Sequence, residues 1–200
     1  MKYFSMFSGI GGFELGINYY YKQQTYKRES LQHERNISST SSQHRWDKQS
    51  KCIGYSEIDK YAIQIYEKRF KGHKNYGNCK EIKWNEVEDF DLLVGGVPCQ
   101  AWSIAGNRKG FEDSRGTMWF EYFRCLKEKQ PKLFVAENVK GILSHNKGKS
   151  FEEICRCFCE LGYAIDFEVL NSKNFGVPQN RQRVFIIGVR LDLLDTSQIF

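Results

Sequence analysis

The stretch KYFSMFSGIGGFELG, residues 2–16, decides the fold because its hydrophobic pattern changes across a run of glycines. Residues 2–7 are strand-like, Gly9, Gly11 and Gly12 form a turn, and residues 13–21 are compatible with a helix. A strand, a glycine turn and a helix in this order are typical of the start of a nucleotide-binding α/β domain.

The rest of the chain repeats this alternation of strands and helices. Further strands are expected at 51–55, 90–94, 133–136, 165–170 and 183–189, and helices at 60–70, 116–129 and 150–161. The short connection between the last two strands favours an antiparallel pair. We therefore expect an α/β domain with a mostly parallel sheet, helices on both faces, an antiparallel last strand, and ligands at the carboxyl ends of the strands.

The length indicates one domain. Two hundred residues with 40% hydrophobic content can build one full core, so 1–200 is expected to be a single catalytic and cofactor-binding domain. Residues 22–50 are polar and charged and show no hydrophobic period. We interpret 22–50 as a mobile insertion.

Composition sets weaker limits on partners and compartment. The 30 Lys and Arg against 24 Asp and Glu permit an acidic partner such as nucleic acid. Seven cysteines behind a start without a secretory signal favour a reduced, cytoplasmic protein, and no apolar run suits a membrane. Cys155, Cys157 and Cys159 lack the spacing of zinc ligands, so we expect packing residues and no metal site.

The glycine turn and a later carboxylate suggest a nucleoside cofactor. Gly9 and Gly11 allow a tight turn, but Glu14 stands where a pyrophosphate-binding sequence has a third glycine or alanine. Glu57 follows a strand and lies 48 positions after Gly9, or 19 without residues 22–50, close to the spacing of a ribose-binding acid. S-adenosylmethionine, a nucleoside without pyrophosphate, fits both features. The alternative is a plain turn and a solvated Glu57.

Cys99 is the candidate nucleophile. It lies in the turn Pro98-Cys99-Gln100, after the strand 90–94 and two glycines, where partial exposure and basic neighbours favour a thiolate. Most free cysteines are small buried hydrophobic residues instead. The segments 137–139 (ENV) and 179–183 (QNRQR) should converge on the same sheet edge, which favours the catalytic interpretation.

Four motifs in order, FSGIGG at 7–12, PCQ at 98–100, ENV at 137–139 and QNRQR at 179–183, resemble those of cytosine-5 DNA methyltransferases of bacterial restriction–modification systems. The segment GFEDSRG at 110–116 strengthens the resemblance, which spans residues 2–190 apart from the insertion. It implies a Rossmann-like class I methyltransferase fold, S-adenosylmethionine as cofactor, DNA as substrate, and a restriction endonuclease as genetic partner.

The resemblance also implies roles for individual residues. Cys99 would add to C6 of a flipped-out cytosine, Glu137 would offer a hydrogen bond to N3, and Arg183 would bind O2. Asn138 would orient the pocket and Arg181 would support it. The residues implied to bind the cofactor are Phe7, Gly9, Ile10, Gly11, Gly12, Glu57, Ile58, Asn78, Cys79 and Pro98. Those implied to bind DNA are Gln100, Arg108, Lys109 and Arg115.

The chain departs from the family pattern in two features. Most members carry Asp at the position of Asn78, where it accepts from the adenine amino group. An amide oxygen can also accept, but it carries no charge. The resemblance also implies a target-recognition region that we do not expect within these 200 residues. We therefore expect either one subunit of a split enzyme or a truncated form. A split enzyme predicts exposed apolar side chains after Arg190: Leu191, Leu193, Leu194, Ile199 and Phe200.

Three other functions remain open. A methyltransferase acting on tRNA would use the same chemistry, and methyl transfer to DNA or to tRNA would separate the two. A noncatalytic nucleic-acid-binding remnant is a further possibility, against which the intact Cys99, Glu137 and Arg183 argue. A nicotinamide-dependent oxidoreductase rests on the glycine turn alone, and Glu14 argues against it.

Overall fold

The computed structural model describes residues 1–35, 50–98 and 118–194, with the backbone alone for 25–35. Its strands are β1 Lys2–Met6, β2 Lys51–Ser56, β3 Leu92–Gly96, β4 Leu133–Val139, β5 Tyr163–Asn171 and β6 Gln182–Arg190. Its α-helices are α1 Gly12–Arg35, α2 Lys60–Arg69, α3 Met118–Lys129 and α4 Lys149–Glu160.

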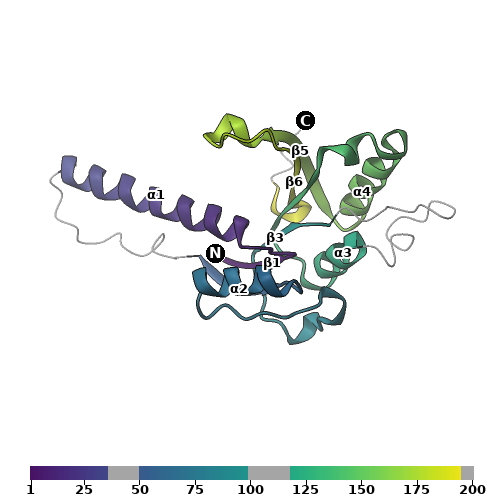
Figure 1. Cartoon of the computed structure of the whole chain (residues 1–200), viewed down its shortest axis with the longest axis horizontal. Coiled ribbons are helices and arrows are strands. Elements are labelled where there is room, and N and C mark those ends of the chain that lie inside the picture. The colour runs from purple at the N-terminus through teal and green to yellow at the C-terminus, as the bar shows by residue number, and fades with distance from the viewer. Residues whose placement is uncertain (36–49, 99–117, 195–200) are drawn as a thin grey trace.

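The described strands form one six-stranded sheet in the order β2-β1-β3-β4-β6-β5. The first four strands in this order are parallel, and β6 runs antiparallel to both β4 and β5 (Figure 1). The predicted α/β class and the antiparallel last strand are therefore confirmed. The chain goes from β1 outward to β2 and then back across β1 to β3, and such a change of direction opens a crevice at the carboxyl ends of the strands.

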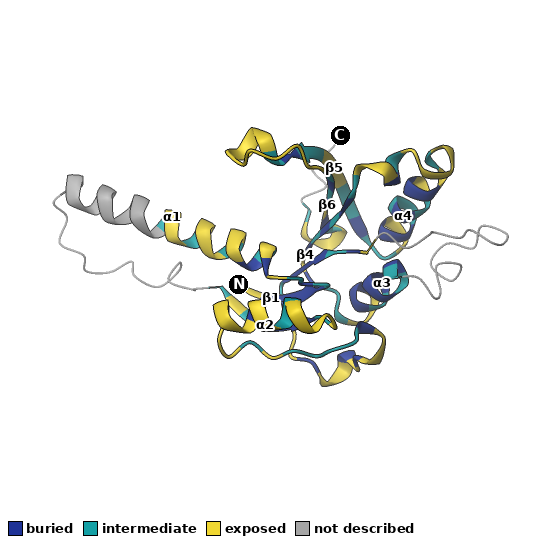
Figure 2. Cartoon of the chain, in the orientation of Figure 1, coloured by how far each residue is buried: buried dark blue, intermediate teal, exposed yellow. Residues whose placement is uncertain are grey.

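Helices cover both faces of the sheet, as expected. On one face, α3 and α4 pack over the main core, which includes Phe4, Leu93 and Phe134 at zero exposure. On the other face, α1 covers a smaller cluster around Tyr3 and α2 covers a cluster around Tyr55. Figure 2 shows the result: β1, β2 and β3 are mainly buried, and the outer sides of α2 and of the described turns of α1 are exposed. Alternation of side chains along each strand supplies both clusters.

The helix α1 is longer than the sequence pattern indicated. It continues to Arg35, so residues 22–35, which we had interpreted as the start of an insertion, are helical. This segment, KQQTYKRESLQHER, is rich in good helix formers and contains no glycine or proline. Helix propagation costs little once the packed first turns exist, so no hydrophobic period is needed to extend it. Residues 36–49 lie outside the described residues.

Other boundaries shift by a few residues. The strand β4 extends to Val139, so Glu137 and Asn138 belong to the strand itself. Two short 3-10 helices, Cys79–Glu81 and Trp84–Glu86, lie between α2 and β3. In the described ranges no helix combines the length and the apolar character that a membrane span requires. After Arg190, Leu191 and Leu193 are each about half exposed, while Leu194 is half-buried.

Candidate active site

The sheet topology brings distant motifs to one edge. The parallel strands β1 to β4 all end there, which places the glycine turn, Glu57, Val97 and Glu137 along the same edge. Because β6 is antiparallel, its first residues lie beside the end of β4, with Arg183 opposite Val139. Two residues 46 positions apart in sequence, Glu137 and Arg183, thus become neighbours.

Glu137 and Arg183 form an ion pair at this edge. The Nε atom of Arg183 lies 2.8 Å from Oε1 of Glu137, and the two side chains are 23% and 21% exposed. A Cβ at Gly96 would lie 3.0 Å from Oε2 of Glu137, so a glycine there leaves room for the carboxylate. The ion pair orients the two side chains toward each other, and both remain partly exposed to solvent. To donate a hydrogen bond, as the sequence analysis expects, Glu137 must first take up a proton.

Asn138 holds the backbone that leads to Cys99. Its side chain is 2% exposed, and its Nδ2 donates to the Val97 carbonyl at 3.0 Å. Its Oδ1 accepts from the Val139 amide at 2.8 Å, and the Val97 amide donates to the Glu137 carbonyl at 3.0 Å. These bonds join the ends of β3 and β4. Asn138 therefore fixes the backbone at Val97, two residues before Cys99 in the sequence.

The remaining expected catalytic and DNA-binding residues are only partly visible. Pro98 is exposed and is the last described residue before the loop. Arg181 is also exposed, just before β6, and its carbonyl accepts from the Ser172 amide at 3.1 Å. Five expected residues lie outside the described residues: Cys99, Gln100, Arg108, Lys109 and Arg115.

Glu57 ties the glycine turn to the end of β2. The Gly9 amide donates to Oε2 of Glu57 at 2.8 Å, and the amides of Ile58 and Asp59 donate to Oε1 at 2.8 and 2.9 Å. Gly9 has a φ of 55°, a left-handed conformation that favours glycine, and a Cβ there would meet no described atom within 4 Å. The backbone of Gly9 is thus open to close approach by a ligand, beside a fixed carboxylate.

Gly11 has a packing role within this turn. Its φ is 88°, and a Cβ there would lie 2.2 Å from a ring atom of Phe70, the residue that ends α2. The absence of a side chain lets the start of α1 pack against α2. Gly12 is the first residue of α1, Ile10 is about half exposed, and Phe7 packs against the main core.

Asn75 connects the Glu57 region with the segment that follows α2. Its Oδ1 accepts from the Gly77 amide at 2.9 Å, and its Nδ2 donates to the Glu57 carbonyl at 3.2 Å. The Ser56 hydroxyl donates to the Gly77 carbonyl at 2.7 Å. Asn75 is not among the site residues expected from the sequence, although an Asn two residues before a glycine is a known turn former. Ile58, also at this edge, is 73% exposed.

Asn78 and Cys79 are more constrained than expected. Asn78 caps the first 3-10 helix: its Oδ1 accepts from the Lys80 amide at 3.1 Å and its Nδ2 donates to Glu81 at 3.0 Å. The Oδ1 atom has a second lone pair that can accept from an adenine amino group. The Cys79 thiol is buried in the core, and burial raises its pKa to about 11. Cys79 can therefore contact a ligand only through its backbone.

Glu14 points into the protein and away from any ligand. It is fully buried, and the Tyr66 hydroxyl donates to its Oε1 at 2.9 Å. The same hydroxyl lies 3.1 Å from Nδ1 of His73. Burial raises the pKa of Glu14 and lowers that of His73. The residue that broke the pyrophosphate-binding pattern thus joins α1 to α2 under the glycine turn.

The donor set suits a nucleoside better than a metal ion. Within the described residues, no group of three or more His, Cys, Asp or Glu side chains is arranged to hold a metal. The edge instead offers an open glycine backbone at Gly9, a carboxylate at Glu57 and an exposed apolar side chain at Ile58. Carboxylates accept hydrogen bonds from ribose hydroxyls, and apolar side chains cover a base.

Comparison with known proteins shows which family the chain resembles. The family model described as "C-5 cytosine-specific DNA methylase" matches residues 1–199. The orphan methyltransferase M.Rho11sI of Bacillus phage rho11s is 44% identical over 200 residues, which cover 99% of this chain and 35% of the phage protein. The type II methyltransferase M1.ScrFI of Lactococcus lactis subsp. cremoris is 39% identical over 187 residues, 94% of this chain and 41% of that protein.

Solved structures show the same fold. A putative DNA modification methyltransferase encoded within an Escherichia coli prophage superposes with a TM-score of 0.67 at 22% identity, covering 98% of this chain and 49% of that one. The fold is therefore the class I methyltransferase fold that the sequence analysis expected. The chain spans between a third and a half of the length of these relatives. It belongs to the C-5 cytosine-specific DNA methylase family.

Proposed function

We propose that this chain is the catalytic and cofactor-binding part of a DNA (cytosine-5) methyltransferase, with Cys99 as its nucleophile. The observation that carries the proposal is the ion pair between Glu137 and Arg183, at the edge where Val97 and Pro98 lead toward Cys99. The Gly9–Glu57 bond lies on the same edge. The ion pair lies on the same sheet edge as the glycine turn proposed to bind the cofactor. This arrangement suits a reaction that needs both an activated cytosine and a methyl donor.

S-adenosylmethionine is the proposed cofactor, and it supplies a methyl group on a sulfonium, a strong electrophile, when bound. Gly9 offers its open backbone to the ligand, and Glu57 accepts from the ribose hydroxyls with a free lone pair. The exposed Ile58 side chain would cover one face of the adenine, and Oδ1 of Asn78 would accept a hydrogen bond from its amino group. Phe7, Ile10, Gly12 and Pro98 complete the surroundings of the ligand.

Cys99 and the Glu137–Arg183 ion pair have different roles in the reaction on cytosine. The Cys99 thiolate adds to C6 of cytosine, and the displaced electron pair makes C5 nucleophilic. Protonated Glu137 donates to N3 and Arg183 donates to O2, so both withdraw charge from the ring as it becomes electron-rich. C5 would take the methyl group from the sulfonium, whose sulfur would be left as a thioether. Water or another base would then accept the C5 proton. The C–H electron pair would re-form the C5–C6 double bond as the C6–S bond breaks, and the sulfur would leave as the Cys99 thiolate.

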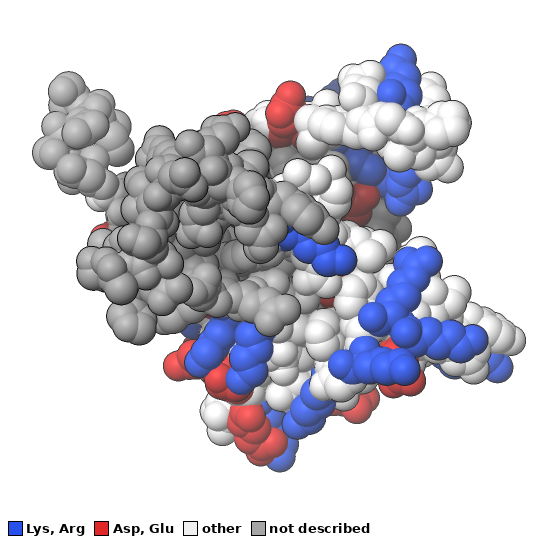
Figure 3. Space-filling view, turned by 90° about the vertical axis from the view of Figure 1, so that its left-hand side faces the viewer, with Lys and Arg blue, Asp and Glu red and all other residues white. Residues whose placement is uncertain are grey.

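The reaction requires a base outside the duplex, because C6 cannot meet a thiolate within the stack. Gln100, Arg108, Lys109 and Arg115 are proposed to bind DNA around the extruded nucleotide. Figure 3 shows Lys and Arg side chains on the drawn part of one face, and the chain has a net charge of +6. A basic surface attracts DNA without selecting a sequence.

Sequence selection is proposed to reside in polypeptide that the relatives carry beyond the region matched here. They are two to three times longer than the matched part, since it covers 35% and 41% of the two described above. A second subunit is one way to supply that region. The type II name of one relative also suggests a cognate restriction endonuclease as a genetic partner.

Trapping with 5-fluorocytosine tests the proposed mechanism. Fluorine at C5 cannot leave as a proton, so elimination stops and the enzyme stays bound to the base. The chain would be mixed with 5-fluorocytosine duplex DNA and S-adenosylmethionine, alone and fused to the unmatched region of the phage rho11s relative. Adducts are resolved on denaturing gels, with 5-fluorocytosine RNA as a parallel substrate.

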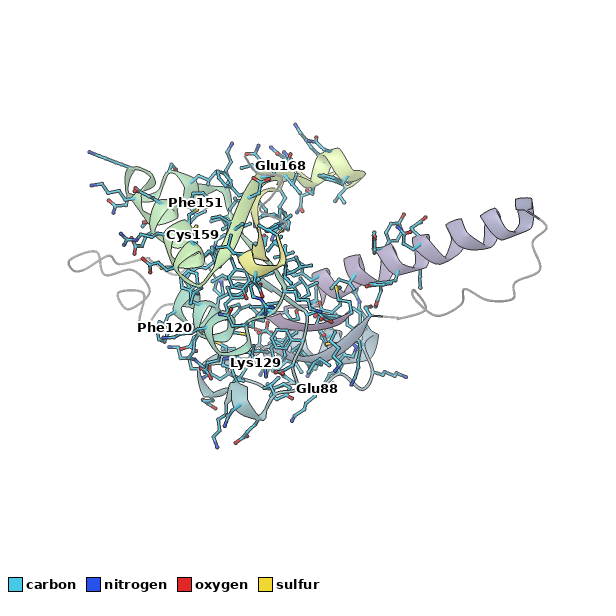
Figure 4. The ribbon with its side chains drawn as sticks, turned by 180° about the vertical axis from the view of Figure 1, so that it is seen from behind. Glu88, Phe120, Lys129, Phe151, Cys159 and Glu168 are labelled. Atoms are coloured by element: carbon cyan, nitrogen blue, oxygen red, sulfur yellow. The ribbon has the colours of Figure 1, made fainter. Side chains whose placement is uncertain are left out.

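We expect a DNA adduct in the fused protein that disappears in Cys99→Ser. The matched control is Cys159→Ser, because Cys159 is exposed on α4 (Figure 4), and this variant should form the adduct normally. If neither the chain alone nor the fused protein forms a Cys99-dependent adduct, the proposed role of Cys99 as the nucleophile is wrong. An adduct with RNA alone would transfer the proposal to an RNA methyltransferase.

A further inference from the structure

Arg124, in the second turn of α3, bonds to a segment that lies far away in the sequence. Its Nη2 donates to the Cys79 carbonyl at 2.8 Å and its Nη1 to the Ile82 carbonyl at 2.9 Å. Its Nε donates to Glu121 at 2.8 Å, and the guanidinium lies 5.9 Å from the centre of the Trp84 ring. The side chain is 21% exposed. One guanidinium thus bonds to two backbone carbonyls and to two carboxylates of its own helix, Glu121 and Glu128.

The two carbonyls flank the first 3-10 helix. Cys79 is its first residue, and Ile82 ends it. The internal bond from the Ile82 amide to the Cys79 carbonyl is long, at 3.4 Å, and 3-10 turns have poor hydrogen-bond geometry in general. Both residues are 5% exposed, so carbonyls left without a donor there would cost free energy. Arg124 supplies a donor to the Ile82 carbonyl and a second, shorter bond to the Cys79 carbonyl.

The turn is attached to the cofactor edge through Asn78. Asn78 precedes Cys79 and caps the turn, and Gly77 is bound from the other side by Ser56 and Asn75. The segment 77–82 is thereby held at two points: by β2 and Asn75 at its start, and by Arg124 at its end. A shift of the turn moves Asn78 relative to Glu57.

The end of α3 makes a similar contact further along. Lys129 donates to the Val87 carbonyl at 2.8 Å and also binds Asp89. Figure 4 shows this region from behind, with Lys129 at the end of α3 and Glu88 on the loop beside it. The stretch from Cys79 to Asp89 is therefore tied to α3 at several points. Of the two cationic contacts, that of Arg124 is the one next to the cofactor edge.

We propose that Arg124 is a positioning residue that fixes the turn 79–82, and through it Asn78, for binding the adenine end of S-adenosylmethionine. The inference rests on the proposed function, since it assigns a cofactor to this edge. Arginine suits the task because its planar group donates in several fixed directions at once, whereas the Lys ammonium is a point charge. Arg124 touches no cofactor itself and acts only through the turn.

The chain contains a matched control for the helical part of this arrangement. Arg156 on α4 pairs with Glu153 and Glu160, three residues before it and four after it, as Arg124 pairs with Glu121 and Glu128. Among the described residues, no bond from the Arg156 side chain to a backbone carbonyl is found. Arg156→Ala thus removes the helix pairs alone, and Arg124→Ala removes the pairs and the bonds to the turn.

The test compares the 200-residue chain with its Arg124→Ala, Arg124→Lys and Arg156→Ala variants. Hydrogen exchange of the amides in 79–82 is measured without ligand, and S-adenosylmethionine binding is measured by equilibrium dialysis. In Arg124→Ala, we expect exchange to quicken about tenfold and the Kd to rise about tenfold, which corresponds to roughly 1.4 kcal/mol. Arg124→Lys, which keeps the charge and protects folding, should give a smaller change in the same direction. Arg156→Ala should change neither quantity.

Some results would contradict the role of Arg124, and one would contradict the proposed function as well. Unchanged exchange and Kd in both Arg124 variants would overturn the inference, as would equal effects in Arg156→Ala. If the unaltered chain binds no S-adenosylmethionine at millimolar concentration, the proposed function fails and the cofactor part of this inference fails with it. The exchange measurement still decides, independently, whether Arg124 holds the turn.

Discussion

The Gly9 amide donates to the Glu57 carboxylate at 2.8 Å, so a hydrogen bond joins the turn after β1 to the residue that follows β2. The carboxylate also accepts from Ile58 and Asp59. A charged acceptor with several backbone donors is rigid before any ligand arrives. The hydrogen bond therefore fixes the position of the glycine turn relative to Glu57, the expected ribose acceptor.

Glu57→Gln should weaken binding of S-adenosylmethionine. An amide in place of the carboxylate turns an –NH2 group toward at least one backbone donor and loses a charge-assisted bond. Such a bond contributes about 1.5–3 kcal/mol, so the Kd should rise roughly ten- to a hundredfold. Calorimetric titration measures the change. Glu67→Gln, on the exposed side of α2, is the control, and an equal loss there would contradict the role of Glu57.

Glu137→Gln should slow methyl transfer in a form of the protein that methylates DNA. The amide can hold the place beside Arg183 but cannot pass a proton toward N3 of the base. The rate should fall by roughly 10²–10⁴, the usual contribution of a positioned proton donor. Single-turnover assays with labelled cofactor measure it, and exposed Glu152→Gln on α4 is the control. A rate equal to that of the control would remove Glu137 from catalysis.

Glu14→Gln should alter how stability depends on pH. Burial raises the pKa of Glu14 above its usual 4.5, so the folded protein holds a proton that the unfolded chain has released. The contribution of Glu14 to the free energy of unfolding is therefore complete below pH 4.5. It is lost as the pH rises through the pKa that Glu14 has in the folded protein. Glutamine lacks this ionisation, so its stability curve should be flatter. Urea unfolding at several values between about pH 5 and pH 8 tests this; parallel curves would contradict it.

Gly11→Ala should destabilise the fold, and Gly16→Ala should not. At Gly11 the φ is 88° and a Cβ would lie 2.2 Å from the Phe70 ring, so strain and overlap act together. We expect a loss of about 2 kcal/mol or more in the free energy of unfolding. Gly16 lies inside α1 with no described atom within 4 Å of its Cβ, so alanine should stabilise by about 0.5–1 kcal/mol.

The two glycine variants are best measured by urea unfolding of otherwise identical chains. A second substitution that shortens Phe70, such as Phe70→Leu, should recover part of the loss in Gly11→Ala by removing the overlap. Equal stability of the two alanine variants would show that Gly11 serves the ligand alone. It would then have no part in the packing of α1 on α2.

The order and type of the elements could be predicted from local sequence patterns. The glycine turn after residues 2–7, the alternation of strands and helices, and the short connection before β6 all depend on neighbours within a few positions, and all were confirmed. The length of α1 was not predicted, because residues 22–35 follow intrinsic helix propensity and have no hydrophobic period. Cys99 stays a prediction, since it lies outside the described residues.

By itself, the sequence determined which residue types stand at the carboxyl ends of the strands, because strand ends and turns are local features. Only the tertiary structure decided what those residues touch. Glu137 meets Arg183 through an antiparallel pairing, Gly11 meets Phe70 through helix packing, and Arg124 reaches a turn 42 to 45 positions earlier. Its Glu121 and Glu128 neighbours look like ordinary helix pairs in the sequence, and its carbonyl partners become visible only when distant segments fold together.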